Sequence, residues 1–160
     1  MNTKKINLSE YNTESLPNGS NFSFAIVVSE WNPQITGELY NGAYDTLVEN
    51  GVNPSKIVTK TVPGSFELSF GADALARSGK FDAVICLGCV IQGETRHFDF
   101  ICNAVANGIT NVSIQREVPV IFGVLTTNNM QQAIDRSGGK HGNKGVEAAV
   151  TALKMAEFNK

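Results

Sequence analysis

The chain has 160 residues, of which 42% are hydrophobic and 18% are charged, and its formal net charge at pH 7 is −2. This length suits one domain with a substantial buried core. The near-neutral charge argues against a nucleic-acid partner and favours small-molecule partners.

The first twenty residues are mostly polar and show no regular apolar pattern. We expect residues 1–20 to form a flexible N-terminal arm and residues 21–160 to form a single domain. The longest apolar run, residues 83–91, is too short to cross a bilayer, and the N-terminal stretch lacks a signal-peptide core. The sequence therefore predicts a cytoplasmic protein with no membrane partner.

Four apolar runs rich in β-branched residues follow, and they predict strands that are mostly buried on both faces. They are FSFAIVV, KIVTKTV, AVICLGCVI and PVIFGVL, at residues 22–28, 56–62, 83–91 and 119–125. Apolar residues at helical spacing lie between and after these runs, at residues 35–47, 68–76, 98–112 and 146–153. Alternating strands and helices predict an α/β fold, a three-layer α/β/α sandwich with a four-stranded parallel sheet of the flavodoxin-like type.

Open parallel sheets bind ligands beyond the carboxyl ends of their strands. The segments that follow the four runs are SEWNPQ, PGSFE, QGETRH and TTNN. We expect them to bring an aromatic ring, a carboxylate, an anion-binding type of turn and a histidine to one edge of the sheet.

The first two of these segments each allow two interpretations. Trp31, the only tryptophan, could stack on a flat ligand ring, or it could be a partly buried aromatic that closes the core. Ser65 and Glu67 could hold a ligand, but an N-cap serine and a first-turn carboxylate account for both without one.

The third segment places His97 at the start of a helix, where we expect Thr95 to be the N-cap. The positive end of the helix dipole favours a neutral imidazole, which can accept and return protons. The alternative is a histidine that only hydrogen-bonds the helix end. Gly93, Glu94 and Thr95 supply backbone N–H groups that could hold a phosphate or simply form a tight turn.

Arg136 ends a short helical segment that begins at Asn128, and it precedes SGGKHGNKG, which we predict to be a mobile loop. Its guanidinium could clamp a phosphate, with help from Lys140, His141 and Lys144 in that loop. The alternative is a solvated arginine that stabilises the helix end.

Cys86 and Cys89 form a C-x-x-C pattern, which elsewhere can mark a redox or metal site. In a strand, however, residues three apart point to opposite faces. The sequence has no second C-x-x-C and no H-x-x-H to complete a zinc site. We therefore predict no metal, and we interpret these two residues and Cys102 as small buried apolar side chains.

Taken together and in this order, SEWN, VPGSFE, GCVIQGETRHFD, GVLT and GNKGVEAA resemble the lumazine synthase family of riboflavin biosynthesis, over residues 24–158. The resemblance implies a transferase without a cofactor. The reaction it implies is the condensation of 5-amino-6-ribitylaminouracil with 3,4-dihydroxy-2-butanone 4-phosphate, which gives 6,7-dimethyl-8-ribityllumazine, phosphate and water.

The resemblance also implies residue roles. His97 matches the proton-transfer residue, and Trp31 matches the position that stacks on the pyrimidine. The remaining matches to substrate-binding positions are Ser65, Phe66, Glu67, Cys89, Val90, Ile91, Glu94, Thr95, Phe122, Arg136 and Lys144. Within this set, the phosphate site is matched by Glu94, Thr95 and Arg136, and the backbone of residues 89–91 faces the pyrimidine. Phe122 matches a residue that packs on the ring from a neighbouring subunit.

Members of the family form homopentamers with active sites at subunit interfaces, and some pack pentamers into an icosahedral shell. The short segment at residues 137–143 favours the shell for this chain. An alternative function is a non-catalytic module of the same fold that stores riboflavin or another flavin on Trp31. A flavodoxin-like electron carrier is disfavoured, because SEWNPQ is not a Ser/Thr-rich phosphate loop.

Overall fold

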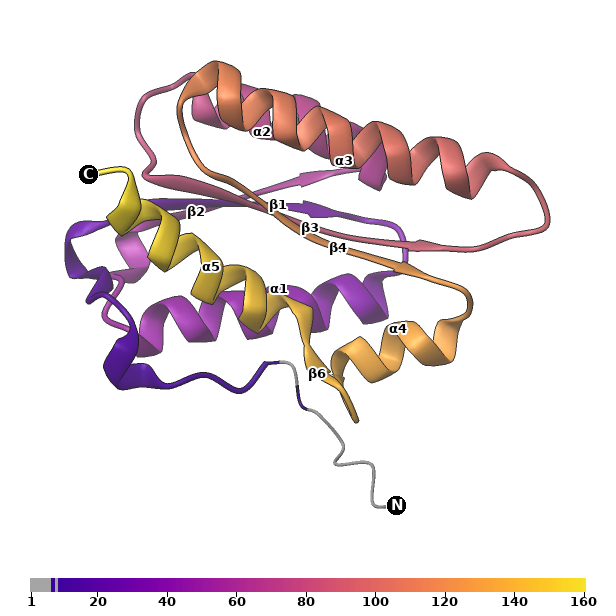
Figure 1. The fold of residues 1–160 in the computed structure, drawn as a ribbon, viewed down its shortest axis with the longest axis horizontal. Coiled ribbons are helices and arrows are strands. Elements are labelled where there is room, and N and C mark those ends of the chain that lie inside the picture. Colours follow the sequence, from indigo (N-terminus) through magenta and orange to yellow (C-terminus); the bar gives the residue numbers. More distant parts are fainter. Residues whose placement is uncertain (1–6, 8) are drawn as a thin grey trace.

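A computed structural model describes residue 7 and residues 9–160 of the chain, which fold into three layers (Figure 1). The middle layer is a parallel sheet with the strand order β2-β1-β3-β4. The strands are β1 (Phe24–Ser29), β2 (Ile57–Val62), β3 (Ala83–Ile91) and β4 (Val120–Thr127). This confirms the predicted α/β fold with its four-stranded parallel sheet.

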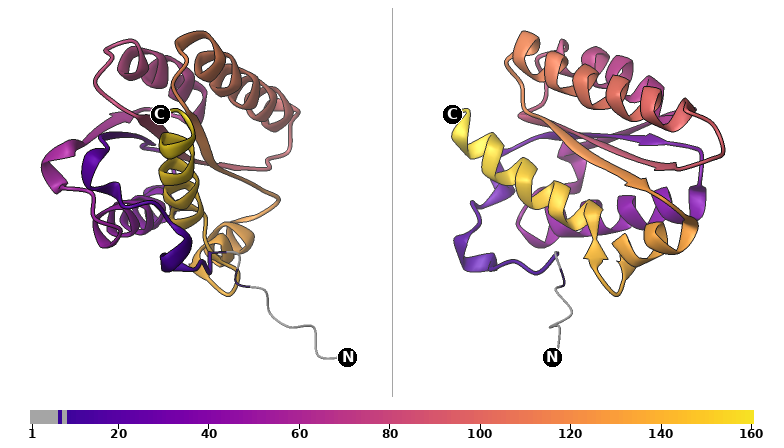
Figure 2. Two further views of the ribbon diagram at one scale, coloured as in Figure 1. Left: turned by 60° about the vertical axis from the view of Figure 1, so that its left-hand side comes forward. Right: turned by 45° about the vertical axis from the view of Figure 1, so that its right-hand side comes forward.

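Helices cover both faces of the sheet (Figures 1 and 2). One face carries α2 (Leu68–Ala76) and α3 (His97–Arg116). The other face carries α1 (Pro33–Glu49), α4 (Met130–Arg136) and α5 (Lys144–Phe158). No helix in the described part of the chain is long and apolar enough to cross a membrane.

The inner strands bury both faces, because successive side chains alternate between two cores. Phe24, Ile26 and Val28 of β1 pack in the core beneath α1 and α5. Ala25 and Val27 of the same strand pack in the core beneath α2 and α3. A continuous apolar run in the sequence is the result.

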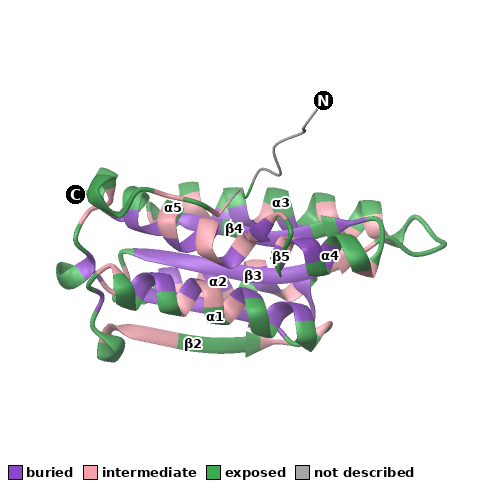
Figure 3. Ribbon diagram, turned by 90° about the horizontal axis from the view of Figure 1, so that it is seen from below, coloured by how far each residue is buried: buried purple, intermediate pink, exposed green. Residues whose placement is uncertain are grey.

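The strand β2 differs from the prediction of burial on both faces. It lies at the edge of the sheet and pairs only with β1 among the strands that the structure describes. Thr59, Lys60 and Thr61 near its middle are exposed, whereas the inner strands are buried (Figure 3). The polar residues of KIVTKTV fit such an edge, where charged side chains discourage unwanted strand pairing.

The two cysteines of the C-x-x-C pattern point to opposite faces of β3, as predicted. Cys86 lies in the core beneath α2 and α3, and Cys89 lies in the core beneath α1 and α5. Burial raises the pKa of the Cys86 thiol to about 12 and that of the Cys89 thiol to about 11. Both thiols are therefore protonated at neutral pH, and the reactive thiolate is suppressed.

The described part of the predicted arm contacts the domain. Leu16 packs against the core beneath α1 and α5, and Gly19 donates its N–H to the carbonyl of Asn50 at 2.8 Å. Residues 1–6 and 8 of the predicted arm lie outside the described residues. Flexibility of residues 1–20 as an arm stays a prediction.

Candidate active site

Two pockets collect most of the predicted site residues. The larger, of about 530 Å³, opens at the carboxyl ends of β1 and β3 and is called the ring pocket here. Its lining residues are Trp31, Asn32, Ser65, Phe66, Glu67, Cys89, Val90, Ile91, His97 and Ile101. The smaller, of about 270 Å³, lies along the edge strand β4 and is called the cation pocket. Its lining residues are Phe122, Val124, Leu125, Thr126, Thr127, Arg136 and Lys144.

Trp31 is held at the mouth of the ring pocket by its backbone. Its N–H donates to the carbonyl of Pro63 at 3.2 Å, and the N–H of Glu30 donates to the carbonyl of Val62 at 2.8 Å. The Trp31 side chain itself is 65% exposed. This exposure contradicts the interpretation of Trp31 as an aromatic that closes the core, and it leaves the indole free to stack on a flat ring.

Ser65 and Glu67 form a 3₁₀ turn (Ser65–Glu67) at the start of α2. The carboxylate of Glu67 accepts the N–H of Gly64 at 2.9 Å, so its predicted capping role is confirmed. The predicted N-cap role of Ser65 is wrong, because Gly64 takes that position. The Ser65 hydroxyl is buried and has no hydrogen-bond partner within the described part of the chain.

His97 is the first residue of α3 and lines the ring pocket. Arg96, not Thr95, takes the N-cap position, although the Thr95 hydroxyl accepts the N–H of His97 at 3.4 Å. The helix begins at His97, so the residue before it, Arg96, is the N-cap, and the Thr95 hydroxyl reaches only the first N–H of the helix. Glu94 and Thr95 are exposed and line neither the ring pocket nor the cation pocket.

The ring pocket combines apolar walls with few ionisable groups. Glu67 and His97 are the only acidic or basic side chains among its described lining residues. An aromatic face, a carboxylate and an imidazole suit a planar heterocycle with polar edges. Neither arginine nor lysine is among the described lining residues to pair with a phosphate dianion.

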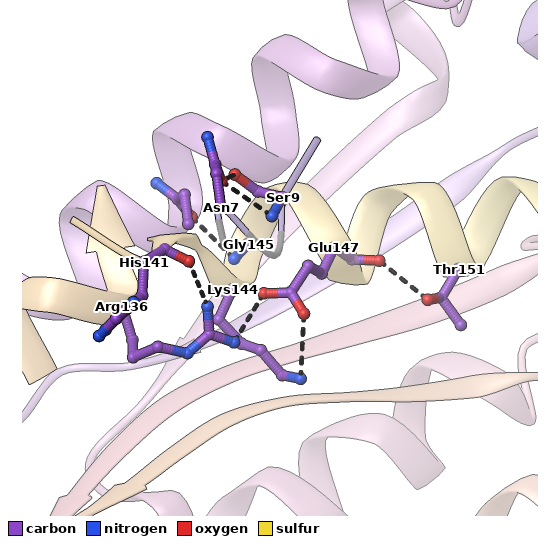
Figure 4. Close-up of polar contacts among 9 residues, drawn as sticks. Asn7, Ser9, Arg136, His141, Lys144, Gly145, Glu147 and Thr151 are labelled. Carbon is purple, nitrogen blue, oxygen red and sulfur yellow. Dashed lines mark hydrogen bonds and ion pairs between the residues drawn. The ribbon is translucent and has the colours of Figure 1, made fainter. Parts of the chain in front are cut away.

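The cation pocket supplies positive charge through Arg136 and Lys144 (Figure 4). The Nη2 atom of Arg136 lies 2.8 Å from the carboxylate of Glu147, and its Nη1 atom donates to the carbonyl of His141 at 2.8 Å. Lys144 is 3.7 Å from the same carboxylate. The Arg136 side chain is only 18% exposed. These contacts fix the position of the Arg136 side chain, so the interpretation as a solvated helix-end arginine is wrong.

The segment predicted as a mobile loop is a short hairpin. Its strands are β5 (Ser137–Gly139) and β6 (Gly142–Asn143), which pair antiparallel. Lys140 pairs with the carboxylate of Asp135 at 3.3 Å and does not line the cation pocket. Hydrogen bonding from Gln131 and the charge of Lys140 hold the pKa of Asp135 below its usual value. The hairpin thus fixes the position of the His141 carbonyl, which accepts the hydrogen bond from Arg136.

Several residues escaped the sequence analysis: Asn32 and Ile101 in the ring pocket, residues 124–127 in the cation pocket, and Glu147, which pairs with both cations. Asn32 lines the ring pocket and donates to the carbonyl of Cys89 at 3.3 Å, with a left-handed φ of 58°. An asparagine before a helix-starting proline was the available signal, since Asn tolerates this conformation. Ile101 follows His97 by one helical turn, and Glu147 follows Lys144 by three residues.

One family model and three relatives match the chain over most of its length. Residues 21–160 match the family model described as 6,7-dimethyl-8-ribityllumazine synthase. A protein of that name from Cytophaga hutchinsonii is 61% identical over 155 residues, which is 97% of each chain. Proteins of the same name from Flavobacterium johnsoniae and Parabacteroides distasonis are 56% and 54% identical, over 98% and 99% of this chain and 82% and 99% of their own.

Proposed function

Because the chain belongs to the 6,7-dimethyl-8-ribityllumazine synthase family, we propose that its ring pocket and cation pocket together perform the condensation catalysed by that family. The protein is a transferase of riboflavin biosynthesis. It joins 5-amino-6-ribitylaminouracil to 3,4-dihydroxy-2-butanone 4-phosphate and releases 6,7-dimethyl-8-ribityllumazine, phosphate and water. One observation supports a site made of two parts: the stacking residue Trp31 and the two cations line separate pockets.

The ring pocket suits the pyrimidine substrate. Its ring would stack on Trp31, with Phe66 on the apolar wall and polar groups near Glu67. The backbone of Cys89–Ile91 lines the same pocket and can meet the carbonyl and N–H groups of the pyrimidine. The cation pocket suits the phosphate of the second substrate, because a guanidinium and an ammonium stabilise its negative charge.

The separation of the two pockets supports a site completed by a second copy of the chain. None of the described residues lines both pockets, and Phe122, 37% exposed, lines the cation pocket at the edge of the sheet. We propose a homopentamer in which one copy supplies the ring pocket and its neighbour supplies Phe122, Arg136 and Lys144. We further propose that the pentamers form an icosahedral shell. Light scattering that gives a pentamer mass over a range of pH and salt would contradict the shell.

His97 is proposed to move protons during the condensation. The amine of the pyrimidine attacks the ketone at C2, so protons must leave nitrogen and reach oxygen before water departs. Loss of a proton from C3 then allows phosphate to leave from C4. We expect His97→Ala to lower kcat about 100-fold, because acid–base help typically contributes this much. Activity should stay above the uncatalysed rate, since holding both substrates together provides most of the acceleration. Complete loss in a folded variant would contradict this division of labour.

Absorbance of the purified protein mixed with both substrates tests the function directly. Lumazine formation with an equal amount of released phosphate is the expected result. The alternative of a flavin-storage module predicts a bound yellow chromophore and no turnover, and the names of the relatives support the enzyme over that alternative.

Free thiols at Cys86, Cys89 and Cys102 support a reducing, cytoplasmic location.

A further inference from the structure

Gly64 lies directly against the ring of Trp31. A β-carbon placed on Gly64 would be 3.1 Å from both Cε3 and Cζ3 of that ring and 3.1 Å from the Oε2 atom of Glu67. Ordinary contacts between carbon atoms have their optimum at about 3.5–4.0 Å. A methyl group at this position would therefore press on the ring and on the carboxylate together.

The backbone does not require glycine here. Gly64 has φ −131° and ψ 176°, an extended conformation that any residue adopts. The requirement comes instead from its two neighbours, which are the aromatic ring and the carboxylate of the ring pocket.

Hydrogen bonds hold the backbone of Trp31 and the carboxylate of Glu67 close to Gly64. Trp31 is tied to Pro63 through its N–H, and the N–H of Gly64 donates to Glu67 at 2.9 Å. Trp31 is 65% exposed in the single chain, so few other contacts within the chain hold its ring in place. The missing side chain at residue 64 therefore sets how closely the ring lies over the backbone and how far it stands from the carboxylate.

We propose that Gly64 is a positioning residue that sets the height of the Trp31 platform and its spacing from Glu67. The platform then takes a planar heterocycle whose face stacks on the indole and whose N–H edge meets the carboxylate. Identifying this heterocycle as the pyrimidine substrate rests on the proposed function. The indole of Trp31 fits at this place because residue 64 has no side chain.

The variant Gly64→Ala tests the proposal, and Trp31 reports on itself because it is the only tryptophan of the chain. The ligand-free variant should show a changed tryptophan emission spectrum, because the ring is displaced. Its KM for the pyrimidine should rise about fivefold, the size expected for a weakened aromatic stack. Its kcat and its KM for the phosphate-bearing substrate should stay within about twofold of wild type, since neither depends on the stack. A general structural defect would not change one KM selectively.

A double-mutant cycle separates the ring contact from other effects of alanine. Phenylalanine at residue 31 lacks atoms at the Cε3 and Cζ3 positions, so Gly64→Ala should cost at most about half as much in the Trp31→Phe background. Gly37→Ala is the matched control, because a β-carbon at Gly37 meets no atom within 4 Å. It should leave emission and both KM values unchanged.

An unchanged emission spectrum in Gly64→Ala, or an equal KM penalty in both backgrounds, would overturn the proposal. A wild-type protein that forms no lumazine would overturn the proposed function instead, and the emission comparison would still decide whether Gly64 positions the ring.

Discussion

Replacing Arg136 by alanine is expected to lower kcat/KM for the phosphate-bearing substrate roughly 100- to 1,000-fold, the loss of one or two charge-assisted hydrogen bonds to phosphate. Arg136 and Lys144 are the cations that line the cation pocket, and both are paired with Glu147. Without the guanidinium, the charges of Lys144 and Glu147 cancel, and no net positive charge remains to attract the dianion. Steady-state kinetics with the pyrimidine held at saturation measure this loss.

Two further variants test whether the loss of kcat/KM comes from the charge and the planar shape of the Arg136 side chain. Arg136→Lys keeps the charge but cannot make the planar two-pronged contact, so its activity should fall between wild type and alanine. Arg77→Ala removes an exposed arginine that pairs with Asp73 at 3.8 Å and lines neither pocket. It should leave kcat/KM unchanged. If Arg136→Ala retained kcat/KM within about fivefold of wild type, the phosphate would have to bind elsewhere.

Replacing Gly145 by alanine is expected to lower the melting temperature by about 10 °C, which corresponds to roughly 3 kcal/mol for a domain of this size. A β-carbon at Gly145 would collide with the backbone carbonyl of Leu39 in α1. Backbone atoms cannot rotate away as a flexible side chain can, so the two helices must separate. Differential scanning calorimetry measures the change.

Separation of α1 and α5 in this variant would also disturb the cation pocket. Asn143 accepts the N–H of Gly145 at 2.8 Å and donates to the carbonyl of Glu38 at 3.0 Å, so it joins the first turn of α5 to α1. Glu147 lies in that turn. Gly37→Ala is the control with the opposite sign, because open space surrounds it in α1 and alanine favours the helix. A melting temperature of Gly145→Ala equal to wild type would show that α1 and α5 can separate without cost.

Much of the fold could be predicted from hydrophobic pattern. The run AVICLGCVI indicated a strand buried on both faces, and its alternation correctly placed Cys86 and Cys89 on opposite sides of the sheet. The edge position of β2 was missed, because the number of neighbours of a strand depends on topology rather than on local sequence. The hairpin in SGGKHGNKG was missed because each of its strands has only two or three residues.

The position of Trp31, Ser65, Glu67 and His97 after the strands predicted their place at one edge of the sheet. Phe66 and Cys89–Ile91 of the same pocket were named only through the family resemblance. Contacts that depend on close packing could not be predicted from the sequence. Local sequence left Ser65 open between a cap and a ligand-binding residue, and the positioning contact of Gly64 left no local signal. A glycine whose φ is ordinary can be explained only by the atoms that surround it.

The sequence by itself determined the strand and helix alternation, the family resemblance and most of the chemical groups of the site, because these follow from residue type and spacing along the chain. The tertiary structure decided which of those groups meet. It placed His97 with Trp31 and Glu67 in one pocket and Arg136 with Lys144 in another. The physical reason is that a pocket is formed by segments far apart in the sequence, and their relative positions are set by the packing of helices against both faces of the sheet.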